Sequence, residues 1–147
     1  MYGWELQRAL YEDPYAAGTL VGVYTAGEPW PLPRTFPAAY LINTGEQHGP
    51  GEHWVAVFLE NSERGEYFDS YGTPPLEPIY QRLRGWGYPD VLYSTKMLQG
   101  PWSTACGLYA YYYIVSRSRG LPLGAVTRVF REYDFPYNEA LIRHVLP

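Results

Sequence analysis

The sequence predicts an α+β fold in which a small mixed β-sheet is flanked by helices. Two patterns support this class: short runs rich in β-branched and aromatic residues between Gly, Pro or Asn, and segments whose apolar residues recur at helical spacing. The 147 residues are 46% apolar and 18% charged, which excludes a disordered chain. The length fits one domain, residues 1–147, with a single compact core.

The N-terminal half is predicted to contain a short helix, an extended segment and three strands. Apolar residues at helical spacing predict the helix, which ends at Pro14. Four prolines in the next segment predict an extended surface stretch, because proline cannot donate a hydrogen bond inside a sheet. The expected elements are a helix over 4–11, the extended segment over 27–37, and strands over 38–43, 53–60 and 66–70, the last two forming a hairpin.

The C-terminal half is predicted to be mainly helical. Small and aromatic residues follow Cys106 without a polar face, and a helix that is apolar all round is a buried helix. Gly120 and Pro122 end that helix. The expected elements are helices over 75–84, 106–116, 126–133 and 138–145 and one short strand over 91–94.

No segment of the sequence predicts membrane insertion or secretion. The longest uncharged apolar run, residues 108–115, is less than half the length of a bilayer-spanning helix. The first residues lack the basic and then apolar pattern of a signal peptide. One cysteine cannot form an internal disulfide, which suits a reducing compartment. We therefore expect an intracellular protein with no membrane partner.

The net charge of −4 conceals a difference between the two halves of the chain. Residues 1–79 carry three bases and eleven acids, whereas residues 80–147 carry eight bases and four acids. Arginine suits phosphate, so a cluster of arginines in the second half is where DNA contact is expected if the chain binds DNA. We favour a solvated basic face, because the whole chain is acidic. The arginines concerned are Arg117, Arg119, Arg128 and Arg131.

Cys106, the only cysteine, is the candidate nucleophile. In the first turn of a buried helix, backbone amides and the helix dipole would favour its thiolate. A lone cysteine is more often a small buried apolar residue. Gly107 and the small residues 103–105 weaken that interpretation, since they leave room for a substrate backbone to approach.

His53 is the candidate general base, and Asp69 is the acid that would orient it. His53 opens a predicted strand, from which its ring can reach a helix N-terminus and transfer protons. Asp69 ends the next strand and can accept the proton of the second ring nitrogen, with capping of the following turn as its alternative role. His48 is expected in an exposed loop and His144 on the surface of the last helix.

Gln99 is the candidate donor to the oxyanion. It lies seven residues before Cys106 on a Gly-Pro loop, where its NH2 group and the Cys106 amide can reach the same oxygen. Each residue alone is weak evidence, but the order His, Asp, Gln, Cys indicates a cysteine protease. A metal site made of His48, His53, His144 and Cys106 is disfavoured, because no pair of these residues has the spacing of metal ligands.

These motifs resemble those of adenain, the adenovirus-type cysteine endopeptidase, and more distantly those of the SUMO-specific Ulp-type proteases. The family's Gly-x-His-Trp is Gly51-Glu52-His53-Trp54 in this chain, and its aromatic and acidic motif is the run over 67–72. Its Gln-Gly-Pro stands at 99–101 and its Ala-Cys-Gly at 105–107. The resemblance covers roughly residues 4–120.

The resemblance implies a papain-like cysteine protease core with the order His, Asp, Gln, Cys, which is permuted relative to papain. It also implies that Gln99 lines the oxyanion hole and that substrates carry glycine next to the cleaved bond. Trp54 is expected beside the His53 ring, with core packing as the alternative. Gly51, Glu52 and Trp54 are the expected substrate-binding residues.

Two departures from adenain limit what the resemblance implies. Asp69 stands where adenain has glutamate. Aspartate is the acid of the SUMO-protease branch. Adenain is stimulated by DNA and by a viral peptide tethered through a disulfide, but a tether to Cys106, the only thiol, would consume the nucleophile. We therefore expect no required cofactor, and any activating peptide must bind noncovalently. We do not expect DNA stimulation, because the C-terminal portion has little to align with adenain.

The sequence thus predicts a viral or virus-like cysteine endopeptidase that cleaves capsid and core precursor proteins near glycine. Its expected location is the host nucleus or cytoplasm and the virion. The first alternative is a SUMO or ubiquitin-like isopeptidase, although the small size leaves little chain for a modifier-binding surface. The second alternative is a noncatalytic papain-like module that binds a peptide or nucleic acid.

Overall fold

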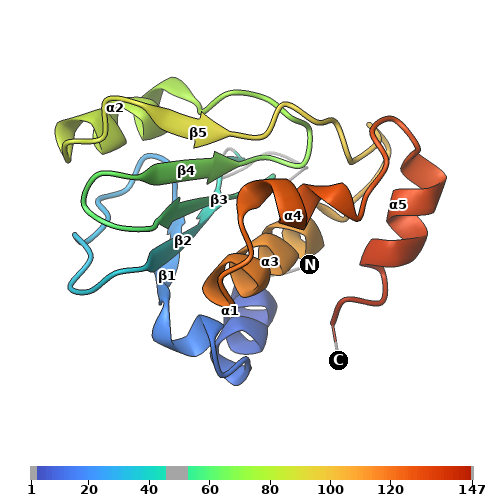
Figure 1. Cartoon of the computed structure of the whole chain (residues 1–147), viewed down its shortest axis with the longest axis horizontal. Coiled ribbons are helices and arrows are strands. Elements are labelled where there is room, and N and C mark those ends of the chain that lie inside the picture. The colour runs from blue at the N-terminus through green and yellow to red at the C-terminus, as the bar shows by residue number, and fades with distance from the viewer. Residues whose placement is uncertain (1–2, 46–52, 147) are drawn as a thin grey trace.

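One mixed five-stranded sheet forms the centre of the computed structural model, which describes residues 3–45 and 53–146 (Figure 1). The strands lie in chain order from β1 to β5. The inner pairs β2–β3 and β3–β4 are antiparallel, whereas β1 and β5 run parallel to their neighbours at the two edges. The strands are β1 (Leu20–Thr25), β2 (Ala38–Asn43), β3 (Trp54–Leu59), β4 (Gly65–Phe68) and β5 (Val91–Tyr93). The predicted α+β class with a small mixed sheet is confirmed.

Helices flank the sheet on both faces (Figure 1). Within residues 3–45 and 53–146, no helix is long and apolar enough to cross a bilayer. The helices are α1 (Gly3–Glu12), the 3-10 turn η1 (Ala16–Gly18), α2 (Glu77–Gly85), α3 (Cys106–Ser118), α4 (Leu123–Arg128) and α5 (Phe135–Ile142).

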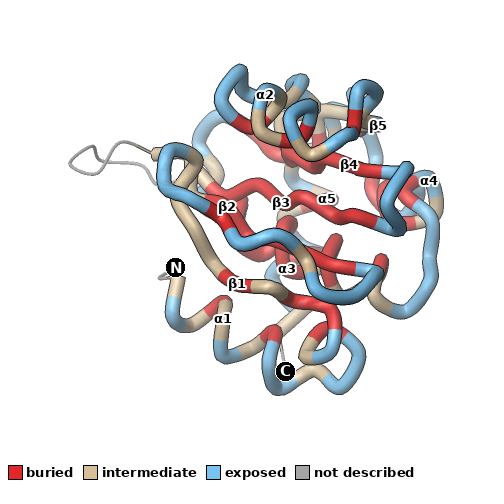
Figure 2. The backbone as a smooth tube through the Cα atoms, turned by 90° about the vertical axis from the view of Figure 1, so that its left-hand side faces the viewer, coloured by how far each residue is buried: buried red, intermediate tan, exposed pale blue. Residues whose placement is uncertain are grey.

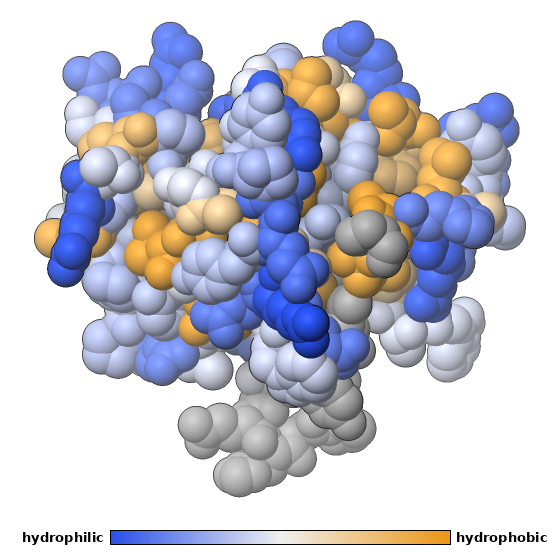
Figure 3. Space-filling model, turned by 90° about the horizontal axis from the view of Figure 1, so that it is seen from below, coloured by the Kyte–Doolittle hydropathy of each residue, from blue (hydrophilic) through white to orange (hydrophobic). Residues whose placement is uncertain are grey.

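The sheet divides the core into two apolar clusters, one on each face, where the sequence predicted a single core. All of β3 is buried, and its alternate side chains point to opposite faces. Trp54, Ala56 and Phe58 join the cluster under α1 and α3. The other three residues of β3 join the cluster that α2 covers. The inner strands β2, β3 and β4 are correspondingly buried in Figure 2, while apolar side chains form separate patches on the face in Figure 3.

Most predicted elements are present, with ends within two residues of their expected positions. β1 was missed, because Gly22 interrupts its apolar pattern. A Cβ at that glycine would lie 2.5 Å from the Tyr24 hydroxyl oxygen, so glycine leaves room here for the Tyr24 ring. The strand is stabilised by its parallel pairing with β2, which depends on residues far along the chain.

The two closing helices begin three residues earlier than predicted, at Leu123 and Phe135. Pro122 is the N-cap residue of α4, and Pro136 stands in the first turn of α5, where proline is favoured. The Asp134 side chain also caps α5 by accepting the Tyr137 N–H. The proline and aspartate residues at these helix starts therefore set where α4 and α5 begin, and the apolar pattern of the sequence did not reveal it.

Arg117 is buried, so it belongs neither to the solvated basic face that we favoured nor to a surface that could contact DNA. Its guanidinium donates to both carboxylate oxygens of Glu66 at 3.0 Å and to the Leu121 carbonyl at 2.9 Å. The Tyr113 hydroxyl donates to the same carboxylate at 2.8 Å. This buried group links α3 to β4 and is part of the protein interior.

The other three arginines are exposed, and two of them lie beside carboxylates, Arg119 beside Asp13 and Arg131 beside Asp134. Arg119 lies 2.7 Å from Asp13 and above the ring of Tyr15. Arg131 stacks on Tyr137 and is exposed, as is Arg128. A solvated surface therefore describes these arginines better than a continuous site for phosphates.

Candidate active site

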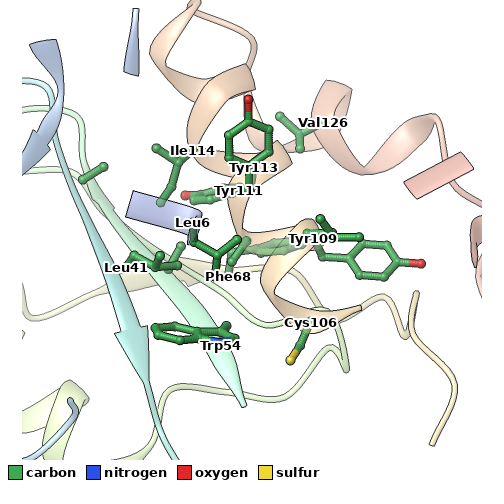
Figure 4. Close-up of a cluster of buried hydrophobic side chains, with 14 of the residues drawn as sticks. Leu6, Leu41, Trp54, Phe68, Cys106, Tyr109, Tyr111, Tyr113, Ile114 and Val126 are labelled. Atoms are coloured by element: carbon green, nitrogen blue, oxygen red, sulfur yellow. The ribbon is translucent and has the colours of Figure 1, made fainter. Parts of the chain in front are cut away.

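Cys106 is the first residue of α3, and its buried side chain lies beside Trp54 (Figure 4). Burial by itself would raise the pKa of the thiol. Hydrogen bonds with His53 and with the backbone N–H groups of Trp54 and Gly107, together with the charge on His53, lower the pKa below its ordinary value. The N-terminus of a helix also favours negative charge. The site thus stabilises the thiolate of Cys106.

Gly107 serves the packing of α3, whereas the sequence indicated that it makes room for a substrate. It is buried, and a Cβ at this residue would lie 2.9 Å from Leu6 and 3.2 Å from Trp54. The missing side chain therefore lets α3 approach α1 and β3 closely, and the expectation that it makes room for a substrate backbone is corrected. Close packing of the helix start fixes the position of Cys106 against the sheet.

The β3–β4 hairpin brings His53 and Asp69 together. His53 directly precedes β3, Asp69 directly follows β4, and the antiparallel register pairs Ala56 with Phe68. The start of β3 and the end of β4 therefore share one edge of the hairpin. His53 Nε2 lies 2.9 Å from Asp69 Oδ1. This leaves Nδ1 as the ring nitrogen for the hydrogen bond with Cys106.

A tight turn after β4 holds the Asp69 carboxylate. Oδ1 accepts the Tyr71 N–H at 2.8 Å, and Oδ2 accepts the Thr73 hydroxyl. Gly72 has a φ of +74°, and a Cβ there would lie 2.7 Å from the Thr95 carbonyl oxygen. Only glycine meets both conditions without strain. The alternative role of Asp69, capping this turn, is therefore real and coexists with its contact to His53.

The charged forms of Asp69, His53 and Cys106 stabilise one another. Burial lowers the pKa of His53, but hydrogen bonds with Asp69 and Cys106 and the charges on both raise it to about 9. Burial raises the pKa of Asp69, whereas its bonds with His53, Thr73 and Tyr71 lower it overall. The Tyr71 ring also lies against the imidazole, with ring centroids 4.9 Å apart. The raised pKa of His53 and the lowered pKa values of Cys106 and Asp69 all favour a thiolate and imidazolium pair beside an ionised carboxylate.

Gln99 lies in the loop between β5 and α3 and is only 1% exposed. Its Oε1 accepts the Ser70 hydroxyl at 2.5 Å, and its Nε2 donates to the Ser103 carbonyl at 3.0 Å. An amide nitrogen carries two hydrogens, so the bond to Ser103 leaves one for a further acceptor. The structure places this amide on the segment that leads into Cys106.

The remaining predicted site residues lie in the core, on the surface or outside the described part of the chain. Trp54 is 5% exposed and its ring packs in the core beside Gly107, so its side chain has the packing role that the sequence left as an alternative. Gly51 and Glu52 lie outside the described residues, as does His48. His144 is exposed. Among the described residues, no group of three or more His, Cys, Asp or Glu side chains is placed to bind a metal ion.

Sequence reasoning missed the hydrogen-bonding residues that surround the site, although a signal for them was present. Ser70, Tyr71 and Thr73 occupy the turn that Asp69 begins, and Ser103 lies in the loop before Cys106. Polar residues next to a candidate acid or nucleophile are common in turns, so the sequence alone did not distinguish local turn formation from contacts within the site.

No protein-family model matches the chain, but several curated proteins are similar to it in sequence. The chain is 30% identical over 126 residues to a protease of Fowl adenovirus A serotype 1, an alignment that covers 76% of this chain and 61% of that protein. It is 34% identical over 94 residues to a protease of Porcine adenovirus A serotype 3, covering 54% and 46%. It is also 33% identical over 90 residues to the cysteine protease S273R of African swine fever virus, covering 52% and 32%.

Among solved structures, the crystal structure of the African swine fever virus pS273R protease aligns with a TM-score of 0.46 at 23% identity, over 74% of this chain and 44% of that one. The sequence matches confirm the resemblance to adenovirus-type proteases that the motifs indicated. The chain spans about half the length of the first curated relatives it matches.

Proposed function

We propose that this chain is a cysteine endopeptidase that cleaves viral precursor proteins near glycine. The observation that supports this best is the continuous contact from Asp69 through His53 to Cys106, at a helix N-terminus that stabilises the thiolate. Four of its relatives are named proteases of adenoviruses, which supports protein substrates. The preference for glycine follows from the resemblance to adenain.

In the proposed mechanism, the Cys106 thiolate attacks the carbonyl carbon of the substrate peptide bond. The negative charge moves to the carbonyl oxygen, which accepts hydrogen bonds from the Cys106 backbone N–H and the Gln99 side chain. His53 then gives its proton to the leaving nitrogen, the C–N bond breaks, and a thioester remains on Cys106. Water attacks the thioester as His53 takes a proton from it. The acid product leaves, and the thiolate and imidazolium pair is restored.

Asp69 has an orienting role in this proposal. Its carboxylate accepts the Nε2 proton of His53 and keeps Nδ1 directed at the sulfur, and its charge stabilises the imidazolium. No metal or organic cofactor takes part in any step. An activating peptide, if one acts on this protein, binds noncovalently, because Cys106 is the only thiol.

Covalent labelling with a Gly-Gly vinyl sulfone peptide tests the proposal. We expect one adduct, located at Cys106 by peptide mass spectrometry, whose rate of formation falls by about 10²- to 10⁴-fold in His53→Ala. Cys106→Ala should remain folded and take no label. An unlabelled wild-type protein, or labelling that is indifferent to His53, would contradict an activated cysteine.

A SUMO-type isopeptidase is the second candidate. One African swine fever virus relative, 32% identical over 90 residues, is named a SUMO-1 cysteine protease, and Asp69 is the acid of that branch. Cleavage rates on a folded Gly-Gly-tailed modifier and on an unfolded Gly-Gly peptide separate the two functions. We expect faster cleavage of the peptide, and a strong preference for the folded modifier would favour the isopeptidase.

A further inference from the structure

The Gln99 side-chain amide is fixed in one orientation by two partners. The Ser103 carbonyl can only accept a hydrogen bond, so the amide nitrogen must face it, at 3.0 Å. The amide oxygen then faces Ser70, whose hydroxyl lies at 2.5 Å and must be the donor. Both side chains are buried, with Ser70 and Gln99 each 1% exposed. Water therefore cannot easily replace a lost partner at this position.

The Ser70 backbone strengthens the same connection. Its carbonyl accepts the N–H groups of Leu98 at 2.8 Å and of Gln99 at 3.2 Å. Ser70 therefore binds the segment before Cys106 through three hydrogen bonds, although 29 residues separate it from Gln99. Since Ser70 also follows Asp69 directly, one turn holds both the acid that contacts the histidine and the Gln99 amide, which lies on the segment leading to Cys106.

We propose that Ser70 is a positioning residue whose hydroxyl keeps the nitrogen end of the Gln99 amide available to the oxyanion. This inference rests on the proposed function. With the oxygen end bound to Ser70 and one Nε2 hydrogen bound to Ser103, the second Nε2 hydrogen is directed to the substrate oxygen. A reversed amide would place Oε1 there and repel the developing negative charge. Ser70 acts through Gln99 and does not touch the substrate.

A kinetic cycle of variants separates this role from a general structural one. Gln99→Ala is expected to lower kcat on a Gly-Gly peptide by about 10²- to 10³-fold. Ser70→Ala is expected to lower kcat by at least about tenfold with little change in KM, since only the transition state carries the oxyanion. In the Gln99→Ala background, Ser70→Ala should cause no further loss. An equal loss in both backgrounds would overturn the inference.

Alkylation of Cys106 by iodoacetamide is the internal control, because this reaction forms no oxyanion. Its rate should be the same in wild type and Ser70→Ala, so a fall would indicate damage to the thiolate or the fold. Ser70→Thr keeps the hydroxyl and should retain most of the wild-type kcat if the larger side chain is accommodated. A Ser70→Thr variant that is folded and alkylated normally but as slow as Ser70→Ala would also contradict the proposal.

The hydrogen bonding of the Gln99 amide can also be measured by NMR on the protein without substrate. In 1H–15N spectra, the Gln99 side-chain NH2 pair of the wild type should exchange with solvent far more slowly than that of the exposed Gln81, and Ser70→Ala should move it toward the Gln81 values. A Gln99 pair that exchanges as fast as Gln81 in wild type would overturn the role of Ser70. If the wild type neither cleaves peptides nor reacts with the vinyl sulfone, the proposed function fails, whereas this spectrum still tests the orientation of the amide.

Discussion

His53 Nε2 and Asp69 Oδ1 lie 2.9 Å apart across the open end of the β3–β4 hairpin, and this contact sets the charge of the site. Burial would lower the pKa of His53, but its bonds and charge interactions with Asp69 and Cys106 raise it to about 9. The imidazolium therefore persists well above the pH at which an ordinary histidine loses its proton. The pKa of Cys106 is lowered at the same time, so the two shifts widen the pH range in which the thiolate and the imidazolium coexist.

Peptide cleavage and thiol alkylation should consequently depend differently on pH. Cleavage needs the thiolate and a protonated His53, so it should rise as Cys106 ionises and fall as the pH passes about 9. Alkylation needs only the thiolate and should stay high above that pH. Rates of both reactions measured from pH 5 to 10 test this. A cleavage rate that falls near pH 6.5, the ordinary histidine value, would contradict the raised pKa.

Replacing Asp69 by asparagine should move the alkaline limit of cleavage downward. The neutral amide keeps the approximate shape of the side chain but removes the charge that stabilises the imidazolium, so the pKa of His53 should fall from about 9 toward 6.5. A raised pKa stabilises the folded protein fully below the unfolded value and ceases to do so as the pH rises through about 9. The stability difference between wild type and Asp69→Asn should therefore be larger at pH 6 than at pH 10, as measured by urea unfolding.

Thr73 offers a milder change at the same carboxylate. Its hydroxyl donates to Asp69 Oδ2, while the residue itself is exposed, so Thr73→Val has nearly the same shape without the donor. We expect Thr73→Val to raise the pKa of Asp69 and to slow cleavage less than Asp69→Asn does, with at most about 1 kcal/mol lost in stability. Thr73→Ser keeps the hydroxyl and should behave as wild type. Equal cleavage rates in the valine and serine variants would show that the hydroxyl has no influence on the site.

Gly107 should tolerate no side chain, because it lies between α3, α1 and β3. In Gly107→Ala the new methyl group would lie 2.9 Å from Leu6 and 3.2 Å from Trp54, and such overpacking typically costs about 1–3 kcal/mol. Gly124→Ala is the matched control, since it lies in α4 with nothing within 4 Å of the added atom. Alanine is the better helix former by about 1 kcal/mol, so the control should be neutral or more stable. Thermal unfolding of both variants tests this: the melting temperature should fall in Gly107→Ala and stay the same or rise in Gly124→Ala.

The sequence predicted where the candidate site residues lie in the fold better than it predicted the contacts that hold them there. His53, Asp69 and Cys106 stand at ends of strongly patterned elements, so their order and the hairpin were enough to expect them at one edge of the sheet. The contacts of Ser70 and Thr73 depend on the path of a short turn, which no periodicity encodes. Gly107 illustrates the same limit, since its neighbours Leu6 and Trp54 come from two other elements.

Arg117 was misjudged for a related reason. Its position near other arginines indicated a surface, but the register of β4 places Glu66 where the two side chains meet at 3.0 Å. A sequence can show that Arg117 is buried only if its ion-pair partner is known. That partner, Glu66, is 51 residues away in the chain. Pairing across the fold thus decides between a basic surface and an internal ion pair.

This buried pair allows a stability prediction with two controls. Arg117→Ala leaves the Glu66 carboxylate buried, with the Tyr113 hydroxyl as its one remaining donor among residues 3–45 and 53–146. Breaking a buried ion pair in this way typically costs about 3–5 kcal/mol. Arg128→Ala removes an exposed arginine and should change stability by at most about 0.5 kcal/mol. Adding Glu66→Gln to Arg117→Ala should recover part of the loss, because a neutral amide oxygen still accepts from Tyr113 while the unpaired charge is gone. Urea unfolding of the four proteins tests this, and a double variant less stable than Arg117→Ala would mean that desolvation of the Glu66 charge is not the source of the loss.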